Sequence, residues 1–289
     1  MIEEFNSMTE LIAAANAEGL ALSELTIRLQ AASMKKTRGE LFEKMRENLA
    51  VMRASAENGM KEKRSASGLT GGLASKLAAH DAGLLGGVAH RAAEYALAIA
   101  EHNACMGRIA AAPTAGSCGI LPGVLLSLGA CGKISDDRLI MGLFNASAVG
   151  MVIAKRATLS GAEGGCAAEC GSAGAMAASA AAELSGGSPG VCANACAIAL
   201  KAVMGLVCDP VAGLVEVPCV KRNATGAVIA LTAAELALSG IESVIPADEV
   251  ISAMKSVGCM MNEALRETSM GGIAASETAG RIETELKDR

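Results

Sequence analysis

Aromatic side chains are almost absent from this chain, which has no Trp, one Tyr and three Phe in 289 residues. Hydrophobic residues nevertheless make up 52% of it, and 59 of them are alanines. Alanine favours helix, whereas the β-branched and aromatic runs typical of strands are scarce. We therefore predict a compact all-α fold in which small side chains let helix backbones approach closely and methionine fills the remaining gaps.

Charge and hydropathy argue against two kinds of partner. The formal net charge of −5 disfavours nucleic-acid binding, because neutralising phosphates requires a basic surface. Residues 109–132 carry no charge and are numerous enough to span a bilayer, but Pro113, Gly116 and Pro122 would interrupt a spanning helix. We predict that this stretch is buried loop and core, and that the chain has no membrane partner.

Residues 1–64 are expected to form a charged helical arm that packs on the body of the protein or on a partner subunit. Ser7 and Glu10 have the capping-box spacing just before an apolar stretch. Farther on, apolar residues recur at helical spacing with charged residues between them: Leu41, Met45, Leu49 and Met52. Residues 65–289 are expected to form the main domain.

In that domain, apolar helices alternate with glycine-rich loops. Ser135 before two aspartates, and Ser188 before Pro189, are start signals for helices. No alternation is long enough for a sheet, and no sequence repeat is found. The helices that we expect cover residues 88–106, 135–157, 171–184, 189–207, 224–239, 247–257 and 260–267.

Three glycine-rich stretches place polar or thiol groups in apolar surroundings. They are residues 112–119, 163–171 and 208–223. Glycine permits unusual backbone angles and lets a ligand approach main-chain N–H groups closely. Loops held by a rigid helical frame are where functional sites tend to lie, so we expect the chemistry here.

The ten cysteines need separate interpretations. The first residues, Met1 to Phe5, are acidic and lack an apolar signal region, which predicts a cytoplasmic chain, and disulfides are rare there. Five cysteines are expected to be inert core residues: Cys105, Cys131, Cys192, Cys196 and Cys259.

Three other cysteines, Cys166, Cys208 and Cys219, are expected on loops at helix ends beside glycine or proline. Their spacing matches neither a ferredoxin-type run nor a pair of Cys-x-x-Cys elements. Spacing alone therefore leaves metal binding and inert burial equally open.

Other catalytic templates are missing. The sequence contains no Gly-x-Ser-x-Gly, His-Glu-x-x-His or Walker lysine motif. The histidines are His80, His90 and His102, too few and too scattered for a zinc site of their own. His102 is interpreted first as a helix-surface residue and second as a candidate general base.

The glycine-rich loops resemble, in order, those of the α chain of bacterial iron–sulfur-dependent L-serine dehydratases of the two-subunit type. The resemblance covers residues 65–274 and is specific, because many irregular loops agree in sequence order. The matching segments are 67–72, 106–108, 112–122, 163–166, 181–189, 208–213, 217–224 and 266–272.

This resemblance implies an all-α, compact helical catalytic domain, over residues 65–289, with glycine-rich loops around a 4Fe–4S cluster. It assigns three cluster ligands, Cys166, Cys208 and Cys219, and leaves one iron open for substrate. The implied reaction is that of an L-serine ammonia-lyase, which converts L-serine to pyruvate and ammonia without pyridoxal phosphate, together with a β chain. The open iron would act as a Lewis acid on the serine hydroxyl.

The remaining site assignments are finer. Some single-chain relatives end in a cysteine that caps the open iron, and this chain ends Lys287-Asp288-Arg289 instead, so self-capping is not expected. His102 is the candidate base, unless the β chain supplies it. Cys118 and Cys170 lie in the same glycine-rich motifs as the site. If the assignment of the three ligands is wrong, one of these two cysteines is the first alternative ligand. The candidate substrate-binding residues, which are equally consistent with turn formation, are Ser67, Thr70, Thr114, Gly116 and Ser117.

Three alternatives stay open at this point. A related lyase on the same fold could eliminate hydrogen sulfide from cysteine. A pyridoxal-phosphate dehydratase would need an α/β scaffold around its lysine, and no such pattern is found. A non-catalytic helical assembly subunit with inert cysteines would be colourless and indifferent to iron.

Overall fold

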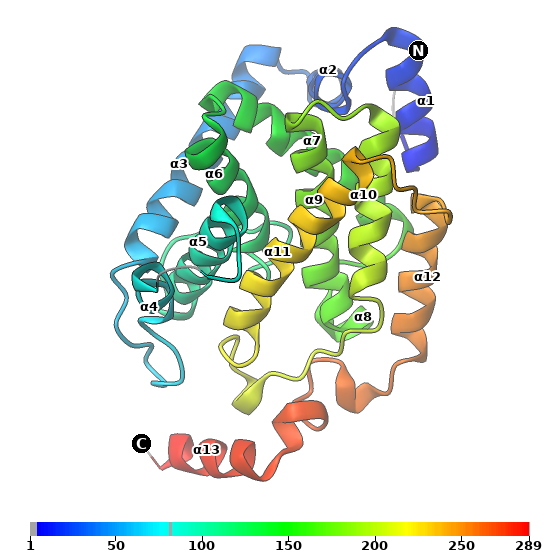
Figure 1. Ribbon diagram of the computed structural model, residues 1–289. Helices are drawn as coiled ribbons and strands as arrows, with labels where there is room; N and C mark the ends of the chain where they lie inside the picture. The colour runs from blue at the N-terminus through cyan, green and yellow to red at the C-terminus, as the bar shows by residue number, and fades with distance from the viewer. Residues whose placement is uncertain (1–4, 81–82, 289) are drawn as a thin grey trace.

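The computed structural model of the chain describes residues 5–80 and 83–288, so residues 1–4 and Arg289, on which two expectations above rest, lie outside it. Across those ranges the fold is all-α as predicted, with no strand beyond an isolated bridge between Cys208 and Arg266 (Figure 1). The α-helices are α1 (Met8–Glu18), α2 (Leu22–Met34), α3 (Arg38–Gly59), α4 (Leu73–Ala79), α5 (Gly87–Ala104), α6 (Ile120–Gly132), α7 (Asp136–Arg156), α8 (Gly161–Cys166), α9 (Ser172–Leu184), α10 (Pro189–Ala202), α11 (Cys219–Leu238), α12 (Ala247–Met260) and α13 (Glu277–Lys287). Short non-α turns are η1 (Ala167–Gly171, a π-helix), η2 (Val211–Gly213), η3 (Glu263–Leu265) and η4 (Gly272–Ala275).

The start signals place most helices correctly. α10 begins at Pro189 with the Ser188 hydroxyl accepting from the Val191 N–H, and α7 begins directly after Ser135. Three expected spans are wrong. α10 ends at Ala202, five residues before the expected end at residue 207. α11 begins at Cys219, five residues before the expected start at residue 224, because the chain turns into the helix directly at Pro218.

No α-helix covers residues 260–267. There the backbone forms only the short turn η3 and then pairs with Cys208, whose N–H donates to Leu265 O at 2.9 Å. This pairing requires extended backbone, which a helix cannot supply. The helices α4, α6, α8 and α13 were not anticipated by the sequence signals.

The N-terminal helices pack on the rest of the bundle: α3 contacts α5, α2 contacts α7, and α1 contacts α10. Ser7 caps α1 as expected, but the Glu10 carboxylate accepts from the Asn6 N–H, so the capping box is only half formed. A complete box is found at Thr37 and Glu40, at the start of α3. The division of the chain at residue 64 stays a prediction.

The centre of the bundle is α9, which is buried along almost its whole length among α6, α7, α10 and α11. Small residues allow close crossings around it. A Cβ at Gly123 of α6 would lie 2.8 Å from Ala92 O of α5, and one at Gly59 of α3 would collide with Ala98 O. The expectation of close helix approach is therefore confirmed.

Methionine is not only a core filler. Met8, Met52, Met176 and Met254 are buried as expected, whereas four others are exposed: Met34, Met106, Met260 and Met270. Two of the exposed ones, Met106 and Met270, lie on loops near one end of the bundle.

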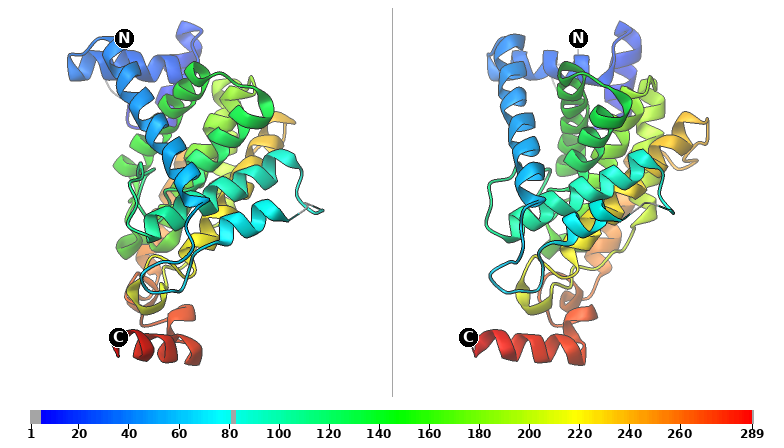
Figure 2. Two further views of the ribbon diagram at one scale, coloured as in Figure 1. Left: turned by 90° about the vertical axis from the view of Figure 1, so that its left-hand side faces the viewer. Right: turned by 60° about the vertical axis from the view of Figure 1, so that its left-hand side comes forward.

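Among the described residues, α7 is the one helix long and apolar enough to cross a membrane, and 67% of its apolar window is buried in the fold. It is a core helix. The uncharged stretch of residues 109–132 forms a loop followed by the largely buried α6. Its burial is as predicted, but Pro122 lies in the first turn of α6 and does not interrupt that helix. Helices α1 and α2 lie at one end of the bundle and α13 at the other, α3 runs along one side, and the segments that carry Cys166, Cys208 and Cys219 lie toward the α13 end (Figures 1 and 2).

Candidate functional site

Three segments bring cysteines together at the α13 end of the bundle. Cys166 ends α8, Cys208 lies in the extended segment before η2, and Cys219 begins α11, so two of them are in helices and not on loops as expected. Burial, followed by the charges of Cys166 and Glu169, raises the pKa of Cys208. Burial and the charge of Cys166 raise the pKa of Cys219 to about 12. Cys166 and Cys208 are buried and Cys219 is partly buried, and the three thiols influence one another's pKa; they are called the cysteine site below.

Cys170 and Arg222 complete this site. The Sγ atoms of Cys166 and Cys170 lie 3.3 Å apart. A hydrogen bond from Cys170 lowers the pKa of Cys166, and the Arg222 guanidinium acts in the same direction. Arg222 is itself held by an ion pair of 2.9 Å with Asp209 and by a 2.9 Å hydrogen bond to Val207 O. A positive charge thus stands beside a group of thiols that would otherwise repel one another as thiolates.

Glu169 is a site residue that the sequence did not single out. Its Oε2 lies 4.0 Å from Cys208 Sγ, and burial raises the pKa of its carboxyl group. Two glycines make room for it, because a Cβ would lie 2.6 Å from Oε2 at Gly161 and 3.3 Å from Oε1 at Gly116. A carboxylate beside Cys166 and Cys170 in an apolar stretch was the signal available in the sequence.

The loop of residues 114–119 reaches the cysteine site through Thr114, whose hydroxyl hydrogen-bonds Glu169. Ser117 is fully buried, and its Oγ lies 3.0 Å from Thr114 Oγ1. Since an ionised Glu169 only accepts, Thr114 donates to it and accepts from Ser117. Of the predicted substrate-binding residues, Thr114 thus contacts the cysteine-site carboxylate, Gly116 lies beside it with no side chain between, and Ser117 supports Thr114 from the interior.

Ser67 and Thr70 lie in a second polar group. The Ser67 hydroxyl donates to the Glu216 carboxylate at 2.8 Å, and Thr70 donates to Glu101 at 3.2 Å. Glu101 is fully buried and also accepts two backbone N–H groups at the start of α4. Both hydroxyls therefore shape this loop, and their contact with substrate stays a prediction.

His102 lies near the end of α5. Its Nδ1 is 2.9 Å from Glu62 Oε1, and its ring rests on Gly107, where a Cβ would collide with it. The next residue, Asn103, donates to Ala115 O at 3.2 Å and ties this end of α5 to the 114–119 loop. His102 is thus a largely buried and oriented side chain, more constrained than a helix-surface histidine.

The other cysteines fall into two classes. Cys118, Cys192 and Cys196 are fully buried, and burial raises the pKa of each to about 12. Cys131 and Cys259 are exposed, so their assignment to the core is wrong. Both lie in the last turn of a helix, α6 and α12, where the chain leaves the core. Cys105 is half-buried, and burial, with Glu62 nearby, raises its pKa to about 11.

The donor set can be tested against the implied cluster. Within residues 5–80 and 83–288, no three His, Cys, Asp or Glu side chains are close enough together to hold one metal ion. An iron–sulfur cluster is larger than one ion, and its ligands are correspondingly farther apart. Three converging soft thiols, a compensating Arg222 and glycine at Gly161 suit such a cluster.

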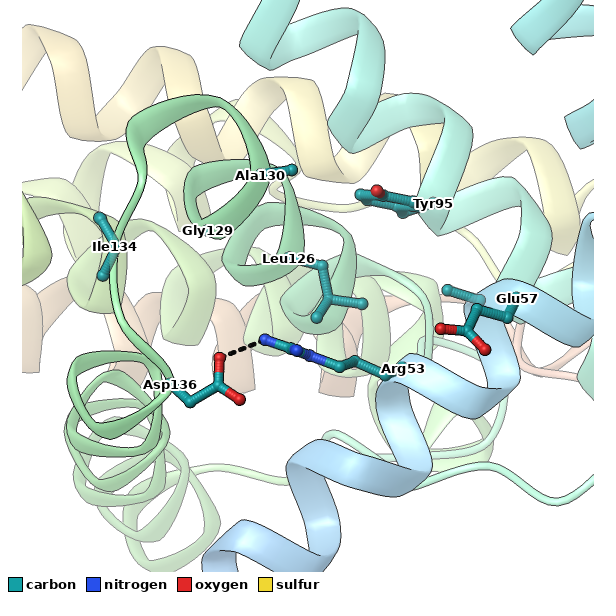
Figure 3. A pocket seen from close by; sticks show the side chains of 9 residues that line it. Arg53, Glu57, Tyr95, Leu126, Gly129, Ala130, Ile134 and Asp136 are labelled. Carbon is teal, nitrogen blue, oxygen red and sulfur yellow. Dashed lines mark hydrogen bonds and ion pairs between the residues drawn. The ribbon is translucent and has the colours of Figure 1, made fainter.

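A separate cleft of about 330 Å³ lies between α3, α5, α6 and the start of α7. An ion pair between Arg53 and Asp136 crosses it, with Glu57 and Tyr95 on its wall (Figure 3). None of the predicted site residues lines this cleft. The candidate site is therefore the cysteine site together with Glu169 and the 114–119 loop, and not this cleft.

Comparisons with known proteins agree with the resemblance in the loops. A family model described as "Serine dehydratase alpha chain" matches residues 17–274 and so begins within the predicted arm. A protein of Bacillus subtilis (strain 168) named "Probable L-serine dehydratase, alpha chain" is 46% identical, over 98% of this chain and 95% of its own length.

Two further relatives differ in length. The "L-serine dehydratase, alpha chain" of Peptoniphilus asaccharolyticus is 41% identical over 96% of both chains. An "L-serine dehydratase" of Streptomyces coelicolor is 39% identical over 94% of this chain, which corresponds to only 61% of that protein. The chain belongs to the serine dehydratase alpha chain family.

Proposed function

We propose that this chain is the catalytic subunit of an L-serine ammonia-lyase, which converts L-serine to pyruvate and ammonia. The observation that carries the proposal is that Cys166, Cys208 and Cys219, from three segments, lie close enough to raise or lower one another's pKa beside Glu169, in a member of the serine dehydratase alpha chain family. Free thiols in this number suit the reducing cytoplasm, where we expect the enzyme to act.

We further propose that these three cysteines hold a 4Fe–4S cluster and that no pyridoxal phosphate is used. When bound, the cluster would supply a Lewis-acidic iron that helps the serine hydroxyl to leave. Arg222 offsets the negative charge of the thiolates, and Gly161 leaves space where a side chain would obstruct Cys208 and Glu169.

The 114–119 loop is proposed to bind the substrate carboxylate. Two of its N–H groups are already bonded, that of Cys118 to Ala115 O and that of Gly119 to Asn223 Oδ1. The Thr114 hydroxyl already hydrogen-bonds Glu169, so the backbone of Gly116 is the group of this loop best suited to bind the substrate carboxylate. Such main-chain donors bind anions without carrying charge themselves.

His102 is proposed to take the Cα proton of serine. With Nδ1–H donating to Glu62, the neutral imidazole presents Nε2 as its basic atom. Asn103 places this end of α5 against the substrate loop. Loss of water from the deprotonated substrate gives aminoacrylate, which hydrolyses to pyruvate and ammonia.

A β chain is the proposed partner. The names of two relatives contain "alpha chain", and this chain corresponds to only 61% of the Streptomyces L-serine dehydratase, so a further polypeptide would supply the rest. Exposed apolar side chains on the segments around the site are suited to burial by such a partner. They are Met106, Val215, Met270 and Ile273.

The test is to purify the chain without oxygen, record its visible spectrum and iron content, and assay pyruvate from L-serine with and without the β chain. Single replacement of Cys166, Cys208 or Cys219 by Ser should remove the iron and the brown colour. Cys192→Ser is the matched control, because Cys192 is buried like Cys166 and Cys208 but lies on α10.

Two outcomes would overturn the proposal. One is a colourless protein that is active with added pyridoxal phosphate, and the other is loss of iron in Cys192→Ser while the helical content is retained. Running the same assay with L-cysteine, and measuring sulfide, distinguishes the serine reaction from a desulfidase reaction.

A further inference from the structure

Cys170 is the cysteine of the site that the proposed ligand set does not use. It lies on the π-helical turn η1, four residues after Cys166, and both side chains are buried. Their Sγ atoms are 3.3 Å apart. A disulfide needs about 2.05 Å, so the two sulfurs would have to approach by little more than 1 Å.

We propose that Cys166 and Cys170 form a redox modification site in the cluster-free chain, in which a hydroperoxide oxidises Cys166 and Cys170 then closes a disulfide with it. The contact between the two sulfurs carries this inference. Both sulfurs belong to one short segment of backbone, so no other element has to move for them to meet.

The reaction balances in two steps. The Cys166 thiol loses its proton and attacks hydrogen peroxide, an S–O bond forms as the O–O bond breaks, and the departing hydroxide takes up that proton as water, which leaves a sulfenic acid. The Cys170 sulfur then attacks the Cys166 sulfur, the S–O bond breaks, and a second water leaves as the S–S bond forms. In sum, two thiols and one hydrogen peroxide give one disulfide and two waters.

The neighbours of Cys166 favour Cys170 as its partner. Cys208 lies on a separate extended segment, with its Sγ 4.0 Å from Glu169 Oε2. Cys219 belongs to a different helix, whereas Cys170 is already in contact and shares one short turn with Cys166.

The consequence for cluster loading rests on the proposed function, whereas the disulfide itself rests only on the contact. A Cys166 held in a disulfide cannot bind iron, so cluster assembly would wait for reduction. The disulfide would also protect Cys166 from irreversible oxidation to the sulfinic acid.

The experiment uses the full chain, purified free of iron and fully reduced, and treated with one equivalent of hydrogen peroxide. Thiols are then counted in denaturant, and the linked residues are identified by mass spectrometry. We expect the thiol count to fall from ten to eight, with loss of two hydrogen atoms from the intact mass and a link between Cys166 and Cys170.

Variants separate the role of Cys170 from general oxidation. Cys170→Ala and Cys170→Ser should gain oxygen atoms on Cys166 and form no disulfide, with circular dichroism confirming that each variant is folded. Cys196→Ser is the matched control, because Cys192 and Cys196 have the same spacing on the ordinary helix α10. It should lose two thiols as the wild type does.

Reconstitution with ferrous iron and sulfide gives the second readout. The oxidised wild type should regain visible absorption only after dithiothreitol is added. Cys170→Ala treated with excess hydrogen peroxide, which carries the Cys166 sulfenic acid on to the sulfinic acid, should fail to regain it even then. A count of ten thiols, or a link from Cys166 to Cys208 or Cys219, overturns the inference. If the expected disulfide forms but the reduced wild type never takes up iron, the proposed function fails and the modification site stands.

Discussion

The backbone N–H of Gly119 donates to Asn223 Oδ1 at 2.8 Å. Through its Nδ2 atom the same side chain donates to Gly116 O at 2.8 Å and to Cys219 O at 2.9 Å. One buried amide thus fastens the proposed substrate loop to the first turn of α11, where a proposed cluster ligand lies. Asn223 therefore positions the 114–119 loop relative to Cys219.

Asn223→Ala should lower the free energy of unfolding by about 1–3 kcal/mol, because it leaves the buried Gly119 N–H without its acceptor. Urea titration of the cluster-free chain measures this. Thr225→Ala is the control, since the exposed Thr225 hydroxyl bonds only to carbonyls of its own helix, and it should change little. Equal stability of the two variants would contradict the role given to Asn223.

Arg222→Met should destabilise the chain by about 3–5 kcal/mol, because Asp209 would be left as an uncompensated buried charge. Asp209 also accepts the Ile273 N–H at 2.9 Å, so hydrogen exchange at residues 271–275 should accelerate. In the double variant with Asp209→Asn the loss should be clearly smaller than in Arg222→Met alone. Additive losses would show that the ion pair does not couple the two residues.

Replacing either of two glycines, Gly119 or Gly174, by alanine should change the stability of the chain, in opposite directions. At Gly119 a Cβ would collide with Ala96 O of α5, a backbone atom that cannot move aside. Gly119→Ala should therefore lower the free energy of unfolding by about 1–3 kcal/mol. At Gly174 of α9 a Cβ meets nothing within 4 Å, and Gly174→Ala should stabilise by about 0.5–1 kcal/mol. Thermal unfolding of both variants gives the comparison, and a Gly119→Ala chain as stable as the wild type would refute the close crossing.

Local signals predicted much of the fold but little of the site geometry. A serine followed by proline predicts the start of α10 without reference to any other part of the chain. The environment of Glu169 is different, because Gly161 and Gly116, from two other segments, create the space that buries it. Nothing near Cys259 in the sequence indicates that its helix turn faces solvent. These features depend on tertiary packing, which spacing does not encode.

His102→Gln should lower kcat for L-serine by about 10²–10⁴-fold if its imidazole takes the Cα proton, with little change in iron content. Glu62→Gln should cause a smaller loss, because it removes the charge that orients His102 but not the imidazole itself. His90→Gln, at the start of α5, is the control and should keep wild-type kcat. If His102→Gln retains kcat, the base lies elsewhere, and histidines of the β chain become the next variants to assay.

Cys196 should make the cluster-free chain less stable as the pH rises. Burial raises its pKa to about 12 in the folded chain, whereas an unfolded cysteine titrates near its ordinary value of about 8.5. Between these values the folded state binds more protons than the unfolded state, so stability is full below about pH 8.5 and falls by up to about 1.4 kcal/mol per pH unit above it. Urea midpoints of wild type and Cys196→Ala at pH 7, 9 and 10 measure the difference, which should narrow or reverse in favour of the variant at high pH. The urea midpoint of Cys259→Ala, which removes an exposed thiol, should change with pH as that of the wild type does. If the midpoint of Cys196→Ala also changes with pH as in the wild type, the Cys196 thiol ionises as readily in the folded chain as in the unfolded chain.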